Sequence, residues 1–206
     1  MKILAFASQK GGVGKTTLAG HLAVEATKYF QERVAIIDTD PQGSLCAWWN
    51  SRSVETPLFI GAKIDELPNQ IEEIKKQKFS YLFIDTPPAI TSSIKKVIFV
   101  SDLVIIPTRP SPHDLRAVAA TVDLAEEYKK PIVFILNGAS IRAKITAQAA
   151  VALSQHGRVS PINIHHRVDF ASSMTDGRTV SEINPHCKSA IEIQETWSYI
   201  HKLVNK

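Results

Sequence analysis

Five short apolar segments alternate with longer amphipathic segments along the chain. The apolar segments read KILAFAS, VAIID, YLFID, LVIIP and IVFIL, and each is apolar nearly throughout, as strands buried on both faces are. The helical periodicity between and after them places candidate helices at Thr16–Phe30, Leu67–Gln77, His113–Tyr128, Ala143–His156 and Lys188–Val204. This alternation predicts an α/β fold of three layers, in which a mostly parallel sheet is flanked by helices.

Length and composition favour one globular domain. The chain has 206 residues, within the range of roughly 100–200 residues that a single core commonly reaches. No internal repeat, low-complexity tract or Pro/Gly-rich linker divides it, so we expect one domain over residues 1–206. No apolar run approaches the roughly 18 residues of a membrane span, and the first ten residues lack a signal-peptide cleavage region. We therefore expect a cytoplasmic protein.

The charge is mildly basic and unevenly distributed. The formal net charge is +4, which alone does not identify a nucleic-acid-binding protein. Residues 136–206 hold eight Lys/Arg against five Asp/Glu, so +3 of the +4 lies in the last third.

A glycine-rich segment between the first predicted strand and the first predicted helix has the form of a phosphate-binding loop. The segment QKGGVGKTT ends in the Gly-Lys-Thr of that motif, and its glycines let backbone N–H groups point at phosphate oxygens. Lys15 is expected to reach the β- and γ-phosphates, and the Thr16 hydroxyl to bind Mg²⁺. The loop departs from the common motif at Gln9, where a glycine is usual, and it carries a second lysine, Lys10.

Three aspartates follow the other apolar strands. Asp85 ends YLFID, where a Walker B carboxylate would help to hold Mg²⁺. Asp38 and Asp40 lie in IIDTDPQGS, and their alternation predicts that they face opposite ways and have different roles. Asp40–Pro41 also suits a purely structural turn.

Taken together, KGGVGKTT, DTDPQGS and DTPP resemble the ParA/MinD family of deviant Walker A ATPases, which are P-loop NTPases. The resemblance implies that Lys10 is the residue that reaches across a nucleotide-sandwich homodimer to the partner's phosphates. It also implies that Asp40 positions the attacking water and that Asp38 lies near Mg²⁺. The implied ligands are ATP and Mg²⁺; the residues implied to bind them are Gly11, Gly12, Val13, Gly14, Lys15, Thr16, Thr17 (at the α-phosphate) and Asn137 (at the adenine), with Thr16, Asp38 and Asp85 at the metal.

Among the members of this family, the chain most resembles the small ParA-type partition ATPases, which lack an N-terminal helix-turn-helix domain. That resemblance implies a nucleoid-associated DNA-segregation ATPase, slow without its partner, whose ATP dimer binds DNA non-specifically and is released by a ParB-type centromere-binding adaptor. Non-specific binding needs cations that face phosphates and no base-reading element. The candidate DNA-binding residues, with Arg167 and Arg178 foremost, are Arg142, Lys144, Arg158, Arg167, Arg178 and Lys188.

Two alternatives use the same ATPase domain for another purpose. A MinD-like protein would place an amphipathic C-terminal helix on a membrane, and the last predicted helix carries Ile193, Trp197, Ile200 and Val204 near one face. That face can equally pack on the sheet, and Glu192 and Glu195 suit a lipid surface poorly, so we expect no stable membrane association. The other alternative is the positioning of a protein cargo. An iron–sulfur carrier is disfavoured by the placement of Cys46 and Cys187.

Overall fold

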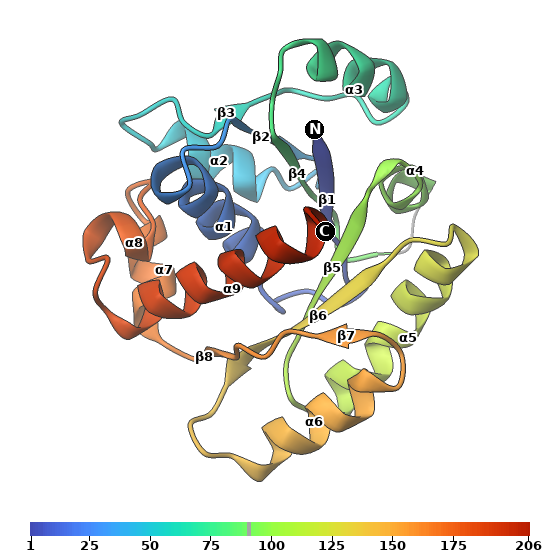
Figure 1. Cartoon of the computed structure of the whole chain (residues 1–206), viewed down its shortest axis with the longest axis vertical. Helices are drawn as coiled ribbons and strands as arrows, with labels where there is room; N and C mark the ends of the chain where they lie inside the picture. The colour runs from blue at the N-terminus through green and yellow to red at the C-terminus, as the bar shows by residue number, and fades with distance from the viewer. Residues whose placement is uncertain (90–91) are drawn as a thin grey trace.

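The computed structural model describes residues 1–89 and 92–206 (Figure 1). Its strands are β1 (Lys2–Phe6), β2 (Val34–Asp38), β3 (Leu58–Phe59), β4 (Tyr81–Asp85), β5 (Leu103–Thr108), β6 (Ile132–Ala139), β7 (Arg158–Val159) and β8 (Ile164–His165). Its helices are α1 (Lys15–Tyr29), α2 (Ser44–Asn50), α3 (Leu67–Lys76), α4 (Ser92–Val100), α5 (Pro112–Glu127), α6 (Lys144–Ser154), α7 (Val168–Met174), α8 (Val180–Ile183) and α9 (Lys188–Val204).

The sheet has eight strands in the order β3-β2-β4-β1-β5-β6-β7, and β8 also pairs with β6. Every pairing between the described strands is parallel. In a parallel sheet all strands end at the same edge, and the segments that follow them converge there. The predicted α/β fold with a mostly parallel sheet is confirmed.

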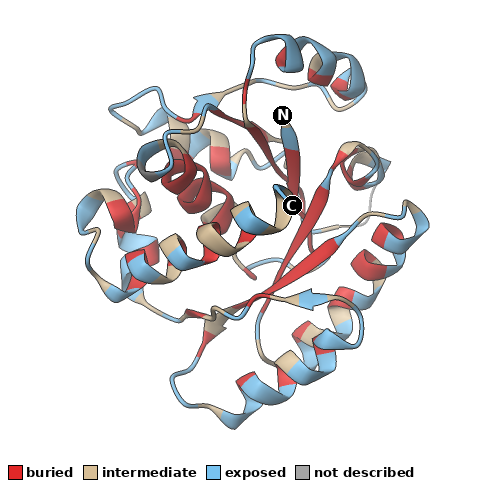
Figure 2. Cartoon of the chain, viewed as in Figure 1, coloured by how far each residue is buried: buried red, intermediate tan, exposed pale blue. Residues whose placement is uncertain are grey.

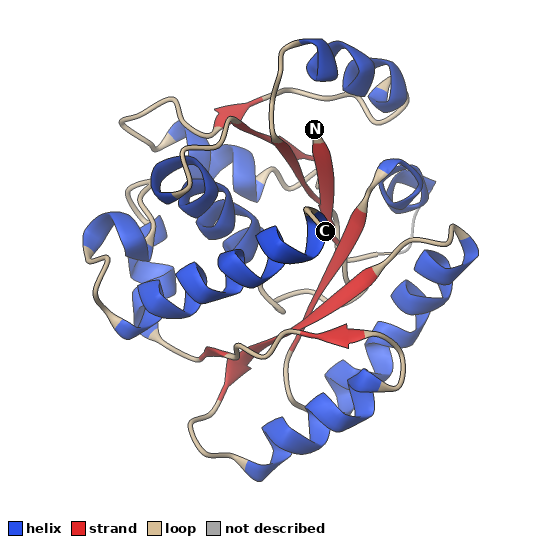
Figure 3. Ribbon diagram, viewed as in Figure 1, coloured by secondary structure: helices blue, strands red, loops and turns tan. Residues whose placement is uncertain are grey.

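Helices cover both faces of the sheet and bury its side chains (Figures 2 and 3). Because side chains alternate along a strand, Leu4 and Phe6 of β1 face one layer and Ile3 and Ala5 face the other. The first layer contains α1, α2, α7, α8 and α9, and the second contains α3, α4, α5 and α6. The strands β1, β2, β4, β5 and β6 are consequently buried almost throughout, which explains their continuous apolar sequences.

The apolar face of α9 packs into the core. Ile193, Trp197 and Ile200 are fully buried against α1 and the sheet, and the Trp197 ring makes edge contacts with Tyr81 and Phe83. This confirms the core-packing interpretation of the last helix. Among the described helices, none is both long and apolar enough to cross a membrane.

Candidate nucleotide-binding site

The phosphate loop joins β1 to α1 at the edge where the strands end. Phe6, the last residue of β1, lies in register with Asp85 of β4, and Asp85 lies in register with Asp38 of β2. The phosphate loop, Asp85 and Asp38 therefore lie side by side at the ends of three neighbouring strands. Thr39 and Thr86 fasten this arrangement, because Thr39 Oγ1 donates to the Asp85 carbonyl (2.6 Å) and Thr86 Oγ1 donates to the Phe6 carbonyl (2.8 Å).

Two glycines give the loop its path. Gly12 has φ 71° and Gly14 has φ 95°, the left-handed region that favours glycine. A Cβ built at Gly14 would lie 2.1 Å from the Asn137 Nδ2. The loop thus packs so closely against the end of β6 that no side chain fits at this position.

Lys15 is the first residue of α1 and is 6% exposed. Its ammonium donates to the Lys10 carbonyl at 3.3 Å. Burial lowers its pKa, while the nearby carboxylates of Asp85 and Asp40 oppose that shift. The result is a cation inside the loop at a helix N-terminus, an arrangement that favours bound phosphate.

Thr16 and Asp85 form a close pair beneath the loop. The Thr16 hydroxyl donates to Asp85 Oδ2 at 2.5 Å, and the Asp85 side chain is fully buried. Burial raises the pKa of Asp85 to about 7, with a smaller contribution from Asp38 in the same direction; Thr16 and Lys15 oppose it. A buried carboxyl that ionises reluctantly is a group whose charge a cation would stabilise.

This pair suits Mg²⁺ held jointly with phosphates. Magnesium sites commonly use one or two protein oxygens and complete their coordination with water and substrate phosphates. Among the described residues, no group of three or more His, Cys, Asp or Glu side chains could hold a metal by itself. Thr16 and Asp85 are the residues that would hold the ion.

Asp38 and Asp40 have local hydrogen bonds that the sequence did not reveal. Asp38 Oδ2 accepts from the N–H groups of Leu45 and Cys46 at 2.9 and 3.0 Å, and Asp38 Oδ1 accepts from Asp40 N. Asp38 thereby satisfies the first turn of α2, which lacks a side-chain N-cap at Gly43. Asp40 Oδ1 accepts from Gln42 N, a turn contact. The roles of Asp38 near Mg²⁺ and Asp40 beside water stay predictions.

Lys10 points to a different place from Lys15. Its ammonium lies 2.9 Å from Asp114 Oδ1 of α5, and its side chain is 40% exposed. Burial opposes ionisation of Asp114, but hydrogen bonds from Ser111 and Lys10 outweigh it and hold the pKa of that carboxyl below its usual value. The two lysines of the loop therefore lie in different environments: Lys15 is buried inside the loop, and Lys10 is partly exposed at the rim of the site.

Two side chains, one in β6 and one directly after β5, donate hydrogen bonds to carbonyls of the phosphate loop. Asn137 Nδ2 donates to the Val13 carbonyl at 2.7 Å, and Arg109 Nη2 donates to the Gly12 carbonyl at 2.6 Å. Asn137 was expected at the adenine; here its amide lies on the phosphate loop, and adenine contact stays a prediction. Arg109 was missed by the sequence analysis. The signal was available, because it follows β5 in the segment VIIPTRPS at the same edge.

Thr17 lies one residue further into α1 and is half-buried. Its carbonyl bonds to the His21 Nδ1 at 2.8 Å, and burial lowers the pKa of His21 to about 4. His21 is therefore neutral, with its Nδ1 proton on that carbonyl and Nε2 3.3 Å from Ser173 Oγ of α7. The α-phosphate contact of Thr17 stays a prediction.

The two foremost candidates for DNA contact each form an ion pair with a carboxylate of this chain. Arg167 Nη2 lies 2.6 Å from Glu192 Oε1, and the Arg167 side chain is 19% exposed. Arg178 makes a bidentate pair with Asp176, its Nη2 2.7 Å from Asp176 Oδ2. Arg167 is thus mostly covered, whereas Arg178 and its partner are both about half exposed, and the contact of either arginine with DNA stays a prediction. The other four candidates are exposed: Arg142 and Lys144 lie just before and at the start of α6, Arg158 starts β7, and Lys188 starts α9.

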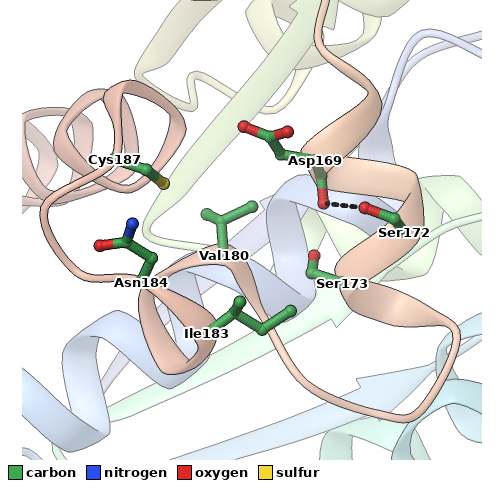
Figure 4. A pocket seen from close by; sticks show the side chains of 7 residues that line it. All are labelled: Asp169, Ser172, Ser173, Val180, Ile183, Asn184 and Cys187. Atoms are coloured by element: carbon green, nitrogen blue, oxygen red, sulfur yellow. Dashed lines mark hydrogen bonds between the residues drawn. The ribbon is translucent and has the colours of Figure 1, made fainter.

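A separate cavity of about 250 Å³ lies among α7, α8 and the start of α9 (Figure 4). Asp169, Ser172, Val180 and Cys187 are among the side chains around it, and Ser172 Oγ donates to the Asp169 carbonyl at 3.3 Å. None of its lining residues belongs to the phosphate loop or to the aspartates at the strand ends. The cavity is therefore distinct from the candidate nucleotide site.

Comparison with known proteins agrees with this geometry. The "Maintenance of carboxysome distribution protein A" of Halothiobacillus neapolitanus is 26% identical over 198 residues, which cover 92% of this chain and 91% of that protein. The protein of the same name from Gloeobacter kilaueensis is 37% identical over 126 residues, 60% of this chain and 56% of its own length.

The fold also matches that of the septum site-determining protein MinD of Pyrococcus horikoshii, solved with Mg-ADP. The two share 19% identity and a TM-score of 0.83, over 98% of this chain and 96% of that one. Residues 4–180 match the CobQ/CobB/MinD/ParA nucleotide binding domain. The chain belongs to the CobQ/CobB/MinD/ParA family of nucleotide-binding domains, as its three loop motifs indicated.

Proposed function

We propose that the chain is a Mg²⁺-dependent ATPase that positions a protein cargo, by means of an ATP-dependent homodimer and a cargo-bound adaptor protein. One observation carries the cargo assignment. A relative named for maintenance of carboxysome distribution matches almost the full length of both chains, so the likeness extends beyond the nucleotide loops that the whole family shares.

The ATPase assignment is supported by the geometry at the strand ends. Lys15 and the loop N–H groups would bind the phosphates, and Thr16 and Asp85 would hold Mg²⁺. Bound there, the ion would neutralise phosphate charge. Asp40, whose carboxylate is close enough to Lys15 to attract it, would orient the attacking water. Hydrolysis converts ATP and water into ADP and phosphate.

In this proposal Lys10 is the residue that contacts the second subunit of the dimer. Its position at the rim lets it leave Asp114 and reach a second subunit, whereas buried Lys15 serves its own loop. A cation supplied by a partner at the developing negative charge acts as an arginine finger does, so hydrolysis by the lone chain would be slow.

The DNA-segregation hypothesis differs from this proposal in its cargo and in its adaptor, which would be of the ParB type. One of its two foremost candidate residues, Arg167, is mostly covered and pairs with Glu192. The membrane-surface hypothesis is weakened by α9, whose apolar face is committed to the core.

A comparison in the native host tests the cargo assignment. The native copy of the gene is replaced by one encoding Lys15→Ala, and two quantities are followed: the loss rate of each replicon per generation, and the distribution of large protein assemblies by electron cryotomography. We expect unchanged replicon retention and clustered assemblies. Increased replicon loss with normally distributed assemblies would refute the cargo assignment in favour of DNA segregation.

A further inference from the structure

Arg109 directly follows β5 and reaches back to the phosphate loop. Because β5 pairs with β1, the residue after β5 lies beside the loop that follows β1. Arg109 Nη2 donates to the Gly12 carbonyl at 2.6 Å. The stem of the same side chain packs on β6, since a Cβ built at Gly138 would lie 3.8 Å from Arg109 Cγ, an ordinary van der Waals contact. The arginine thus extends from β6 to the loop and is held at both ends.

The hydrogen bond from Arg109 determines which way one peptide group of the loop faces. The peptide bonds of the loop are trans, and in a trans peptide the C=O of one residue and the N–H of the next point in opposite directions. Because the Gly12 carbonyl points to Arg109, the Val13 N–H points away from Arg109. The same relation holds one residue further on: Asn137 Nδ2 donates to the Val13 carbonyl at 2.7 Å, so the Gly14 N–H points away from Asn137.

These two N–H groups are available to a ligand. Within residues 1–89 and 92–206, neither the Val13 N–H nor the Gly14 N–H donates a hydrogen bond to another group of the chain. Successive backbone N–H groups without partners attract an anion, and these two directly precede the first turn of α1. The hydrogen bonds on the outer side of the loop therefore leave two adjacent donors for a phosphate.

The donor to the Gly12 carbonyl carries a full positive charge. A charged donor makes a shorter and stronger hydrogen bond than a neutral amide does. It also polarises the peptide group between Gly12 and Val13, and connected hydrogen bonds strengthen one another, so the Val13 N–H becomes a better donor. Arg109 therefore influences both the direction and the strength of this loop donor.

We propose that Arg109 is a positioning residue for phosphate binding: it holds the Gly12 carbonyl on the outer side of the loop and so directs the Val13 N–H at a nucleotide phosphate. This inference rests on the proposed ATPase function. Arg109 acts through the backbone and does not touch the nucleotide, because it lies on the opposite side of the Gly12–Val13 peptide from the N–H. Backbone N–H groups of phosphate loops bind the α- and β-phosphates, which ADP and ATP share.

Two other roles for Arg109 lead to different expectations. A direct contact with the γ-phosphate would strengthen the binding of ATP and leave the binding of ADP unchanged. A purely structural contact would affect the stability of the fold without affecting the Val13 N–H. The positioning role affects the affinities for ADP and ATP by the same factor.

Isothermal titration calorimetry with Mg-ADP and with Mg-AMPPNP, an ATP analogue that is not hydrolysed, tests the assignment. The wild-type chain is compared with Arg109→Ala and with Arg109→Lys, which keeps a charged donor. The matched control is Arg158→Ala, which removes an exposed arginine at the start of β7. We expect Arg109→Ala to bind both nucleotides about tenfold more weakly and Arg109→Lys to stay within about threefold of the wild type. The control keeps the wild-type affinities.

NMR spectra of the ¹⁵N-labelled chain report on the loop donors directly. When Mg-ADP binds to the wild type, we expect the amide protons of Val13 and Gly14 to move downfield, as protons in hydrogen bonds do. In Arg109→Ala the shift of the Val13 proton becomes smaller, whereas the shift of the Gly14 proton, which Asn137 positions, is retained. Thermal melting by circular dichroism verifies that the variants are folded, and the wild-type spectra test the Val13 contact without any variant.

Unchanged affinity of Arg109→Ala for both nucleotides would overturn the positioning role and leave the ATPase proposal standing. A loss confined to Mg-AMPPNP would also overturn it, in favour of a direct γ-phosphate contact, as would a Val13 amide proton that does not respond to Mg-ADP in the wild type. Absence of binding of either nucleotide by the wild-type chain would instead contradict the ATPase proposal, and the positioning role with it.

Discussion

At the scale of single residues, the phosphate loop leaves no space for a side chain at position 14, which is a glycine. The position has φ 95°, and a Cβ there would meet the Asn137 amide at 2.1 Å. We predict that Gly14→Ala reduces ATP affinity at least tenfold, because strain of about 1–2 kcal/mol and the clash both act on the loop. Isothermal titration calorimetry measures this. Gly61→Ala is the control, since nothing lies within 4 Å of a Cβ at Gly61, and equal ATP affinity of the two variants would contradict the account.

Glu25 is a second residue with a measurable consequence. It is 1% exposed in α1; Ser181 Oγ donates to its Oε2 at 2.8 Å, and no described residue bonds its Oε1. Burial raises the pKa of Glu25 from 4.5 to about 7. Between those values the folded chain keeps a proton that the unfolded chain releases, so the free energy of unfolding falls as the pH rises from about 4.5 to about 7.

We therefore predict that Glu25→Gln, which keeps the shape but not the charge, stabilises the chain above pH 7. The expected gain at pH 8 is about 1 kcal/mol, or about 2–4 °C in Tm, and at pH 5 the gain is much smaller. Calorimetric Tm values at both pH values test this. Exposed Glu195→Gln serves as control, and a gain for Glu25→Gln that does not depend on pH would show that the buried carboxyl is not its source.

At the scale of elements, one buried ion pair joins the end of α2 to α8. The Arg52 side chain is 2% exposed; its Nη2 lies 2.8 Å from Glu182 Oε1, and its Nη1 donates to the Gly177 carbonyl at 2.6 Å. Glu182 also accepts from Thr179 N in the capping box that begins α8. The pair thus ties the segment after α2 to the first turn of α8.

We predict that Glu182→Ala lowers the free energy of unfolding by about 3 kcal/mol, because it leaves the Arg52 charge buried without its partner. Urea denaturation measures the change. The control is Glu73→Ala, which removes an exposed pair with Lys76 and is expected to cost less than about 0.5 kcal/mol. A similarly small loss of unfolding free energy in both variants would show that the Arg52–Glu182 pair contributes little to stability.

The sequence patterns predicted some elements well and missed others for physical reasons. VAIID and YLFID match β2 and β4, since strands buried on both faces leave a continuous apolar run. The two-residue strands β3, β7 and β8 carry no period to detect. At the site, loop motifs marked Lys15, Thr16 and Asp85. The clamp by Arg109 joins residues 97 positions apart, a contact that local spacing does not encode.

At the scale of the whole molecule, Lys10 and Asp114 connect the phosphate loop to α5. The ion pair keeps Lys10 on its own subunit. We predict that Asp114→Asn favours the ATP dimer two- to fivefold, the effect of losing a partly exposed pair of about 0.5–1 kcal/mol. Analytical ultracentrifugation with ATP gives the dimer dissociation constant. A weaker dimer in Asp114→Asn would mean that the pair supports dimerisation instead of competing with it.

The most direct test of the central claim, an ATP dimer completed by Lys10, is size-exclusion chromatography with light scattering in Mg²⁺. Asp40→Ala slows hydrolysis, so ATP persists during the run, and it is compared with Lys10→Ala/Asp40→Ala, each with ADP and with ATP. We expect twice the 22.7 kDa chain mass only for Asp40→Ala with ATP, and the monomer mass in the other three runs. A monomer in all four runs, or a dimer that persists without Lys10, would contradict it.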